Sequence, residues 1–388
     1  MPQNEAKQAR NVLFVVKAMA NQGGGAERVL AEVASGLARR GHQVAILSSD
    51  PAGSTPFYTL DDRVKLLGLG IGNVVASTSV RELCRRIWRF RSMVRTLSPD
   101  VVVGFMHSTY LPLGIALLGS GVPMVASEHI GPEHYRKYPL QRIALALTPL
   151  IASSITVVSR PIMRSYGWWL RRKMTVVANP VKKPAFRGAR TGSGKLLLTV
   201  GRLAPQKDHV VLISAFAALA SEFPDWRLRI AGEGELRGAL EAQVKSLALE
   251  DRIELPGSIS DIDAEYSAAD LFVMPSSYES FGLATAEALM HGLAAVGFSD
   301  CPGTNDLIRD GENGILVRGE DRSRALATAL SRLMRDPAEL ARLSASSVQS
   351  IMDQHGIDVV LDQWESVLQA ASRKNGQPTR QARLEVRP

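Results

Sequence analysis

The amino-acid sequence predicts an α/β protein made of two doubly wound domains. The chain has 388 residues, which is long for one domain and suits two. Apolar stretches of strand length alternate with segments whose apolar residues recur at helical spacing, as in β-α-β units. This alternation stops near residue 190 and then starts again, so each half should hold its own sheet.

The first half should open on one β-α-β unit. Residues 11–19 form an apolar run of strand length, and the segment GGGAERVLAEVASGLARRG has apolar residues at helical spacing and ends at Gly41. The run HQVAIL then supplies the second strand. Further strands of this half are expected at 101–106, 123–127, 154–159 and 174–181.

A stretch rich in glycine, serine and arginine, residues 186–194, is typical of a linker. It separates a first domain, 1–185, from a second domain, 195–370, whose last helix is free to cross back to the first. Strands of the second domain are expected in KLLLTVGRL, WRLRIAG, RIELPG, LFVMPS, AAVGFS and GILV. The basic, polar residues 371–388 have the composition of a disordered tail.

Composition favours a packed protein of a reducing compartment. Hydrophobic residues make up 45% of the chain and charged residues 22%. Cys84 and Cys301 are far apart in sequence, which is neither a disulfide framework nor a zinc signature. The first ten residues lack the apolar core of a signal peptide, and the longest apolar stretches, of 16 residues, are shorter than the roughly 20 that a spanning helix needs. We therefore expect a cytoplasmic protein.

Positive charge is concentrated in the first half of the chain. Residues 1–190 hold 26 Lys/Arg and 10 Asp/Glu, whereas residues 191–388 hold 20 and 28, which together give the net charge of +8. Such asymmetry indicates that the first domain meets an anionic partner. We expect no nucleic acid there, because no recognition module is present.

Two basic segments of this half, 79–97 and 163–173, are candidates for contact with an anionic membrane surface. The first interleaves its arginines with Trp88, Phe90 and Met93, as helices that lie on lipid do. The alternative is an ordinary surface helix, with its apolar residues packed inward and its arginines in solvent.

Three loops that follow strands could hold an anion or a nucleobase. Gly24 and Gly25 open a helix and let backbone N–H groups approach an anion, although their spacing matches neither a dinucleotide fingerprint nor a P-loop. Arg202 and Lys207 flank a loop at a helix start, where two cations could neutralise a diphosphate. The third loop, which offers backbone groups to a nucleobase edge, contains Gly257, Ser258 and Ile259. Taken singly, each loop is equally typical of an ordinary turn.

The segment SSYESFGLATAEALMHG, residues 276–292, combines two carboxylates with a helix N-terminus. LATAEALMHG should form a helix that stops at Gly292. Glu279 then lies in the preceding loop, and Glu287 projects from the second helical turn. The alternative is that Glu279 caps the helix and Glu287 faces solvent.

The chemistry of this segment suits a nucleotide-sugar. Carboxylates hydrogen-bond paired hydroxyls, such as those of a ribose or a hexose. Backbone N–H groups at a helix N-terminus bind phosphate. Here those groups belong to Phe281, Gly282 and Leu283.

The segment resembles the E-x7-E region of glycosyltransferase family four, a large family of retaining enzymes with the GT-B fold. The motifs GGGAERVL, ANPV, VGRLAPQKD, GEGE, PGSISDI, YSAADLFVMPS and LIRDGENGILV are also similar to those of the family and occur in the same order. The resemblance covers about residues 11–370. It implies two Rossmann-like domains that face one another across a cleft, the first binding the acceptor and the second the nucleotide-sugar.

The resemblance also implies catalytic roles for single residues. Glu279 would hydrogen-bond the donor sugar, and Glu287 the ribose. Arg202 and Lys207 would bind the diphosphate and stabilise it as it leaves. His129, which follows a first-domain strand in MVASEH, would lie near the reacting sugar.

Further contacts implied for the donor are made by backbone or small residues. They involve Gly24, Gly25, Phe281, Gly282 and Leu283, besides the loop of Gly257, Ser258 and Ile259. On the acceptor side the resemblance points to Glu128, and more weakly to His107. The nucleotide-sugar is a co-substrate, and no cofactor is expected.

The implied activity is retaining transfer of a hexosyl unit to a lipid-linked or polysaccharide acceptor, in envelope glycan assembly at the inner face of the cell membrane. UDP is favoured over GDP as the nucleotide. No nucleophile for a double displacement is evident, so front-face substitution is favoured, in which a donor phosphate oxygen takes the acceptor's proton. The alternatives are a GDP-mannose-dependent mannosyltransferase, a nucleotide-sugar epimerase on the same fold, and a scaffold without activity.

No metal site is expected. Asp261 and Asp263 form a D-x-D triplet, which holds a metal in other transferases, but here its simpler role is to cap the following helix. His129 and His134 lack the further ligands that zinc needs.

Overall fold

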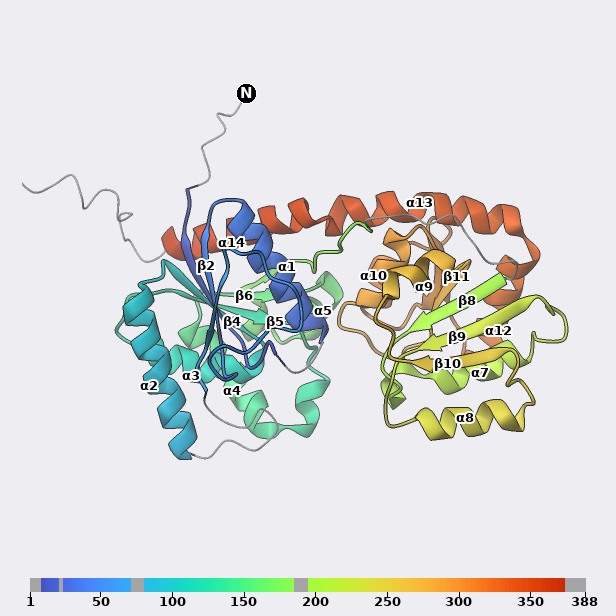
Figure 1. Cartoon of the computed structure of the whole chain (residues 1–388), viewed down its shortest axis with the longest axis horizontal. Helices are drawn as coiled ribbons and strands as arrows, with labels where there is room; N and C mark the ends of the chain where they lie inside the picture. The colour runs from blue at the N-terminus through green and yellow to red at the C-terminus, as the bar shows by residue number, and fades with distance from the viewer. Residues whose placement is uncertain (1–7, 21–23, 71–79, 185–194, 374–388) are drawn as a thin grey trace, which may run out of the picture. The chain divides into compact units, whose positions relative to one another are not determined.

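A computed structural model describes residues 8–20, 24–70, 80–184 and 195–373. The chain divides into two compact units, unit 1 with residues 1–180 and 357–388 and unit 2 with residues 181–356. Each unit is a parallel sheet with helices on both faces (Figure 1).

Unit 1 contains a parallel sheet in the order β3-β2-β1-β4-β5-β6-β7. Its strands are β1 Asn11–Val15, β2 Gln43–Ser48, β3 Lys65–Gly68, β4 Val101–Phe105, β5 Met124–Glu128, β6 Ser154–Val157 and β7 Met174–Val176. The central strands β4 and β5 are buried throughout, as parallel strands covered on both faces should be. Strand order reverses between β1 and β4, and sheets of this kind bind ligands at such a switch point.

The helices of unit 1 lie on both faces of its sheet, with α1 and α14 on one face and α2, α3 and α4 on the other (Figure 1). They are α1 Gly25–Arg39, α2 Val80–Leu97, α3 His107–Leu117, η1 His134–Lys137, α4 Pro139–Ile151, α5 Arg160–Ser165, α6 Trp168–Arg171 and α14 Ile357–Arg373. The last helix belongs to unit 1. Trp364 packs on Phe14 with 6.0 Å between ring centroids, and Arg40 pairs with Asp362 at 2.8 Å.

Unit 2 contains a parallel sheet in the order β10-β9-β8-β11-β12-β13. Its strands are β8 Lys195–Val200, β9 Trp226–Ala231, β10 Ile253–Gly257, β11 Leu271–Met274, β12 Ala294–Phe298 and β13 Gly314–Val317. Its helices are η2 Pro205–Lys207, α7 His209–Ala217, α8 Arg237–Ser246, α9 Ile262–Ala268, α10 Leu283–Met290, α11 Thr304–Leu307, α12 Arg322–Arg335 and α13 Pro337–His355. Figure 1 shows α7, α8 and α12 on one face and α9 and α10 on the other.

The prediction of two doubly wound domains is confirmed, and each expected strand forms. Strand β3 was not anticipated, because KLLG is short and shows no alternation. The units divide at 180/181 rather than at 185, since the N–H of Val181 bonds the carbonyl of His355 in unit 2 (2.8 Å). Helix α14 continues to Arg373, into the segment expected to be a tail. The expected linker, 186–194, and the tail from residue 374 lie outside the described residues.

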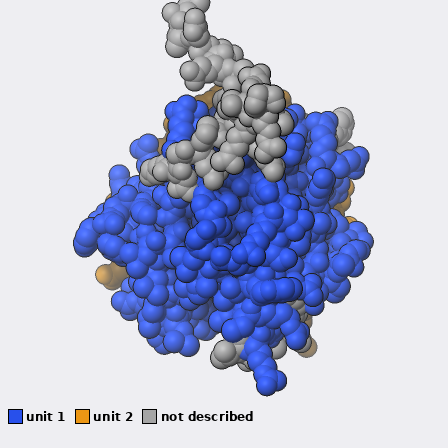
Figure 2. Space-filling model, turned by 90° about the vertical axis from the view of Figure 1, so that its left-hand side faces the viewer, with its two compact units in different colours: residues 1–180, 357–388 blue, residues 181–356 orange. Residues whose placement is uncertain are grey.

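Helix α2 exposes fewer aromatic residues than the sequence predicts. Trp88 is 66% exposed, but Phe90 and Val94 are buried. Arg91 donates to the carbonyl of Leu118 at 2.9 Å, beyond the end of α3. The prediction of Phe90 as an exposed aromatic is therefore wrong, because this ring holds α2 against the body of unit 1, whose surface is blue in Figure 2. Within the ranges that the structure describes, no helix is long and apolar enough to cross a membrane.

Candidate functional site

The predicted donor residues of unit 2 gather at the carboxyl edge of its sheet. Strand order reverses between β8 and β11, so the loops after these two strands are neighbours at a switch point. The loop after β8 carries Arg202 and Lys207, and the loop after β11 carries Glu279. A backbone hydrogen bond joins the two loops, with the N–H of Ser277 donating to the carbonyl of Gln206 at 3.0 Å.

Lys207 and Glu279 form an ion pair between the two loops. Nζ of Lys207 lies 2.5 Å from Oε1 of Glu279, and the side chains are 17% and 10% exposed. The hydroxyl of the buried Ser276 donates to the same oxygen at 2.7 Å. Glu279 therefore accepts hydrogen bonds from two side chains and does not cap α10, whose N-cap is Gly282 without a side-chain bond. The capping alternative is excluded for Glu279.

Arg202 lies in the same loop but behaves differently from Lys207. It is exposed, and its guanidinium forms no hydrogen bond or ion pair with any described residue. The structure thus places the two predicted cations on one loop, with only Lys207 joined to Glu279. A free guanidinium at this edge can bind a diphosphate without first giving up a protein partner.

Glu287 is buried in α10 and does not face solvent as the alternative supposed. It is 8% exposed, and Oε2 accepts a hydrogen bond from the hydroxyl of Tyr266 at 3.0 Å. Tyr266 lies in α9 and is itself buried. The bond fixes the direction in which the carboxylate projects. Sequence reasoning missed Tyr266, because a single tyrosine in YSAAD carries no spacing signal.

The N-terminus of α10 depends on two glycines. Gly282 has a φ of +84°, in the left-handed region that favours glycine. Gly303, after β12, packs so closely that a Cβ there would lie 2.8 Å from the backbone of Phe281 and of Glu279. Phe281 is buried and Leu283 begins the helix, so these residues present backbone rather than side chains. The role of Gly303 was not predicted.

Arg322, at the start of α12, ties several of these loops together. Its NH2 group donates to the carbonyls of Pro275 and Ser276, each at 3.1 Å. Its Nε pairs with Asp208 at 3.3 Å, and its guanidinium stacks 3.5 Å from the centroid of the Phe298 ring. Arg322 therefore supports the segment that carries Glu279. No sequence motif pointed to it, because its partners come from two separate loops and from strand β12.

The predicted nucleobase loop follows β10. Gly257 has a φ of +86°, and its carbonyl accepts a hydrogen bond from the N–H of Gly232 at 2.8 Å. Ser258 is exposed and Ile259 is half-buried. The loop therefore lies beside the loop after β9 at the carboxyl edge, with Gly257 itself buried.

In unit 1, His129 follows β5 at the carboxyl edge. Its Nε2 lies 2.9 Å from Oγ of Ser127, which accepts a hydrogen bond from the hydroxyl of Thr156 at 3.0 Å. Assigned from this network, Ser127 donates to Nε2, and the neutral ring carries its proton on Nδ1. Desolvation lowers the pKa of His129 to about 3, so the ring is neutral near pH 7. Nδ1 bonds no described residue.

Glu128 is buried directly before His129. Its Oε2 accepts a hydrogen bond from the hydroxyl of Tyr135 at 2.8 Å, and its Oε1 accepts one from the N–H of Ile130 at 2.9 Å. Burial raises the pKa of Glu128 to about 7, against the lowering effect of these bonds. The residue can therefore exchange a proton near neutral pH.

His107 begins α3 after β4. The preceding Met106 has a φ of +71°, an uncommon conformation for a residue other than glycine. The His107 ring lies 5.3 Å from the rings of His134 and Tyr135. Burial, and then the neighbouring His134, lower the pKa of His107 to about 4. Strands β4 and β5 are thus each followed by a histidine whose pKa is lowered by burial.

Gly24 and Gly25 lie at the start of α1 in unit 1. Gly24 is the N-cap without a side-chain hydrogen bond, and Gly25 is the first helical residue. A Cβ at Gly24 would lie 2.2 Å from Oε2 of Glu27, so the missing side chain leaves room for that carboxylate. Burial raises the pKa of Glu27. The two glycines thus lie where a helix begins, and the carboxylate of Glu27 lies over the same helix start. Their predicted contact with the donor phosphates stays a prediction.

The D-x-D triplet caps a helix, as predicted. Oδ1 of Asp261 accepts a hydrogen bond from the N–H of Ala264 at 3.1 Å at the start of α9. In the part of the chain that the structure describes, no three His, Cys, Asp or Glu side chains lie together as metal ligands would.

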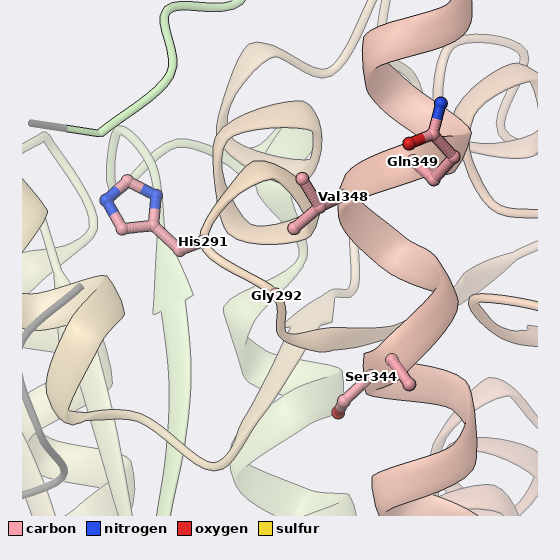
Figure 3. Close-up of a pocket in the computed structure, with 6 residues that line it drawn as sticks. His291, Gly292, Ser344, Val348 and Gln349 are labelled. Atoms are coloured by element: carbon pink, nitrogen blue, oxygen red, sulfur yellow. The ribbon is translucent and has the colours of Figure 1, made fainter. Parts of the chain in front are cut away.

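A shallow hollow in unit 2 lies at the far end of α10 from Glu279. Figure 3 shows its lining by His291, Gly292, Ser344, Val348 and Gln349. Helix α10 begins at the carboxyl edge and ends at this hollow, about 12 Å away along its axis. The hollow contains no predicted site residue and is separate from the site at the carboxyl edge.

Comparison with known proteins assigns most of the chain to glycosyltransferase families. Residues 23–183 match the family described as Glycosyltransferase Family 4, and residues 183–349 match Glycosyl transferases group 1. An "Uncharacterized glycosyltransferase" of Haemophilus influenzae is 26% identical over 352 residues, 89% of this chain and 96% of its own. A Campylobacter jejuni "GalNAc-alpha-(1->4)-GalNAc-alpha-(1->3)-diNAcBac-PP-undecaprenol alpha-1,4-N-acetyl-D-galactosaminyltransferase" is 27% identical over 347 residues, 88% of this chain and 94% of its own.

Solved structures share the fold. Anabaena Alr3699/HepE, in complex with UDP-glucose, superposes with a TM-score of 0.77 and 19% identity over 93% of this chain and 100% of its own. Sucrose-phosphate synthase from Thermosynechococcus elongatus superposes with a TM-score of 0.76. It is 19% identical, and the match covers 92% of this chain and 98% of its own. The chain therefore belongs to glycosyltransferase family four and has the GT-B fold.

Proposed function

We propose that this glycosyltransferase moves a hexosyl unit from a UDP-sugar to a lipid-linked or polysaccharide acceptor, with retention at the anomeric carbon, in envelope glycan assembly. The observation that carries the proposal is the Lys207–Glu279 pair at the switch point of unit 2. It places Lys207, a cation that can bind phosphate, directly beside Glu279, a carboxylate that can accept hydrogen bonds from sugar hydroxyls. A nucleotide-sugar presents these two chemical groups next to one another.

In the proposed complex the donor replaces the internal pair. Lys207 and the exposed Arg202 bind the diphosphate, while Glu279 accepts hydrogen bonds from the sugar hydroxyls. Glu287, held by Tyr266, binds the ribose. The backbone N–H groups at Phe281, Gly282 and Leu283 add contacts to phosphate and sugar.

The proposed reaction is a front-face substitution without a metal ion. The bond from the anomeric carbon to the diphosphate oxygen breaks, and the acceptor oxygen bonds to the same face of that carbon. The acceptor's proton passes to a phosphate oxygen, and the nucleoside diphosphate leaves. Lys207 and Arg202 stabilise the negative charge that grows on the leaving group. Glu279 and Glu287 are already engaged by Ser276 and Tyr266, which favours positioning roles over nucleophilic attack.

Unit 1 supplies the residues proposed for the acceptor and for part of the donor. We propose that His129 lies near the reacting sugar and that Glu128 and His107 contact the acceptor. Gly24 and Gly25 would contact the donor phosphates. A neutral His129 with its proton on Nδ1 is a hydrogen-bond donor for a sugar hydroxyl.

Two relatives support the proposed substrates. The Campylobacter jejuni relative is named for an acceptor on diphosphoundecaprenol, which favours a lipid-linked acceptor at the inner face of the membrane. The Anabaena structure holds UDP-glucose, which favours uridine as the base.

The test is sugar transfer by the full chain, with a panel of nucleotide-sugars and a lipid-linked glycan acceptor. We expect product with one donor, an unchanged anomeric configuration by NMR, and loss of transfer in E279A. E312A is the matched control, because it removes a carboxylate from an exposed ion pair with Arg309 in the same unit. Epimer formed from donor alone, inversion at the anomeric carbon, or full activity in E279A would overturn the proposal.

A further inference from the structure

Helix α4 of unit 1 exposes a row of large apolar side chains. Leu140 is 81% exposed, Ile143 57%, Leu147 41% and Leu150 67%. We infer that this row inserts into an anionic lipid surface and seats unit 1 on the membrane. Single exposed leucines are ordinary, but a contiguous apolar patch marks an interaction surface.

The row is a second apolar face of α4, distinct from the face that packs inward. Leu145, Thr148 and Pro149 are the buried residues of the helix. At about 100° per residue, the four exposed side chains fall within an arc of about 80° and extend about 15 Å along the axis. A helix that is apolar on two sides is normally buried on both. In the described part of the chain, the outer side of α4 is left uncovered.

Neighbouring helices extend the apolar surface. Trp168 in α6 is 68% exposed, and the indole of Trp169 next to it donates to the carbonyl of Ala146 in α4 at 2.9 Å. Leu118, after α3, is 59% exposed, and α3 packs along α4. The second basic segment of the sequence thus lies against α4. A tryptophan beside an aliphatic row is the composition of a helix at a lipid interface.

Positive charge surrounds the row. Residues 134–184 contain ten Lys/Arg and no Asp/Glu. Exposed arginines occur in the same helices, with Arg142 in α4 and Arg171 and Arg172 in and after α6, whereas Arg136 before α4 is paired with Glu133 at 2.9 Å. Arg172 stacks on Trp169 at 4.2 Å from the ring centroid. Each cation near an anionic leaflet adds to the attraction of the surface.

This charge selects a membrane over a second copy of the chain. A second copy would bring an equally basic surface against the row, and the two would repel one another. An anionic leaflet complements the arginines and also accepts the apolar side chains. Helix α2, expected from sequence to make this contact, is the weaker candidate because Phe90 and Val94 point inward and Arg91 bonds the carbonyl of Leu118.

Membrane contact through α4 extends the proposed function. It rests on the proposed lipid-linked acceptor, since such an acceptor is presented at a membrane leaflet. The test is co-sedimentation of the full chain with phosphatidylcholine vesicles that contain or lack phosphatidylglycerol. Wild type should bind the anionic vesicles and lose binding as salt rises. The double variant I143E/L147E should bind the anionic vesicles at least about tenfold more weakly than wild type does.

The matched control is V210E/L247E, which adds two carboxylates at apolar positions of unit 2 with similar exposure, 46% and 41%. It should bind vesicles as wild type does. Thermal melting should show that both variants fold, and a nucleotide-sugar should protect I143E/L147E as it protects wild type. Loss of that protection in all proteins would count against the proposed function alone.

The inference is overturned if wild type does not bind anionic vesicles, or if the two double variants bind them equally. It is also overturned if the molar mass of wild type in solution is that of a dimer that I143E/L147E dissociates, with no change in vesicle binding. That result would assign the row to a contact between copies.

Discussion

The ammonium of Lys207 lies 2.5 Å from a carboxylate oxygen of Glu279, and the two side chains come from loops 72 positions apart in sequence. Both side chains are largely buried, so each charge depends on the other for compensation. In the proposed complex, the donor phosphate binds the ammonium of Lys207, and sugar hydroxyls donate hydrogen bonds to the carboxylate of Glu279. The free enzyme thus keeps both groups in position before the donor arrives.

Replacement of Lys207 by Met should lower the rate of transfer about a hundredfold to a thousandfold, or about 2.7–4 kcal/mol of transition-state stabilisation. The cause is the loss of one preorganised cation beside the leaving diphosphate. K245M removes an exposed lysine from α8 and should leave the rate unchanged. Steady-state kinetics of the two variants checks this. Equal rates of transfer by K207M and K245M would show that Lys207 does not take part in the reaction.

Glu287→Gln should raise the donor KM on the order of tenfold or more while kcat changes little. A hydrogen bond to a charged group contributes about 1.5–3 kcal/mol, and a ribose contact distant from the reacting carbon is made equally in the ground and transition states. Y266F removes the bond that directs this carboxylate and should raise KM less. A fall in kcat with unchanged KM would contradict a ribose-binding role.

Arg322→Met should loosen the loops after β8 and β11. The change removes bonds to the carbonyls of Pro275 and Ser276 and the pair with Asp208, so the free energy of unfolding should fall by about 1–3 kcal/mol. The donor KM should rise, because Ser276 positions Glu279. R324M, from the exposed face of the same helix, is the control for both urea unfolding and kinetics.

His129 and Glu128 should give stability opposite dependences on pH. The pKa of His129 is lowered from 6.5 to about 3, so its contribution is complete above about pH 6.5 and is lost as pH falls. The pKa of Glu128 is raised from 4.5 to about 7, so its contribution is complete below about pH 4.5 and is lost as pH rises through 7. Each effect is at most about 1.4 kcal/mol per pH unit.

These dependences can be separated by urea unfolding at about pH 5 and about pH 8. Relative to wild type, H129N should be more stable at the lower pH than at the higher, and E128Q should show the reverse. E133Q changes an exposed carboxylate five positions from Glu128 and should follow the wild-type profile. Parallel profiles for all four proteins would contradict the neutral His129.

Local sequence patterns predict most of the fold because most strands and helices here are signalled by their own residues, with the short strand β3 as an exception. Glu279 in a loop and Glu287 in the second turn of α10 follow directly from such a pattern. The supporting contacts do not. Arg322, Tyr266 and Gly303 act on partners brought near by tertiary packing, and no local periodicity marks them. The exposed face of α4 was missed for the same reason, since an apolar stretch in sequence does not show which side is covered.

The central claim is that unit 2 binds a nucleotide-sugar through Lys207 and Glu279. Equilibrium unfolding of the full chain with each of a panel of nucleotide-sugars tests it most directly. One donor at a hundred times its dissociation constant should add about 2.7 kcal/mol to the free energy of unfolding of wild type. K207M and E279Q should lose most of that gain. Absence of protection by every nucleotide-sugar, or equal protection of both variants and wild type, would contradict the claim.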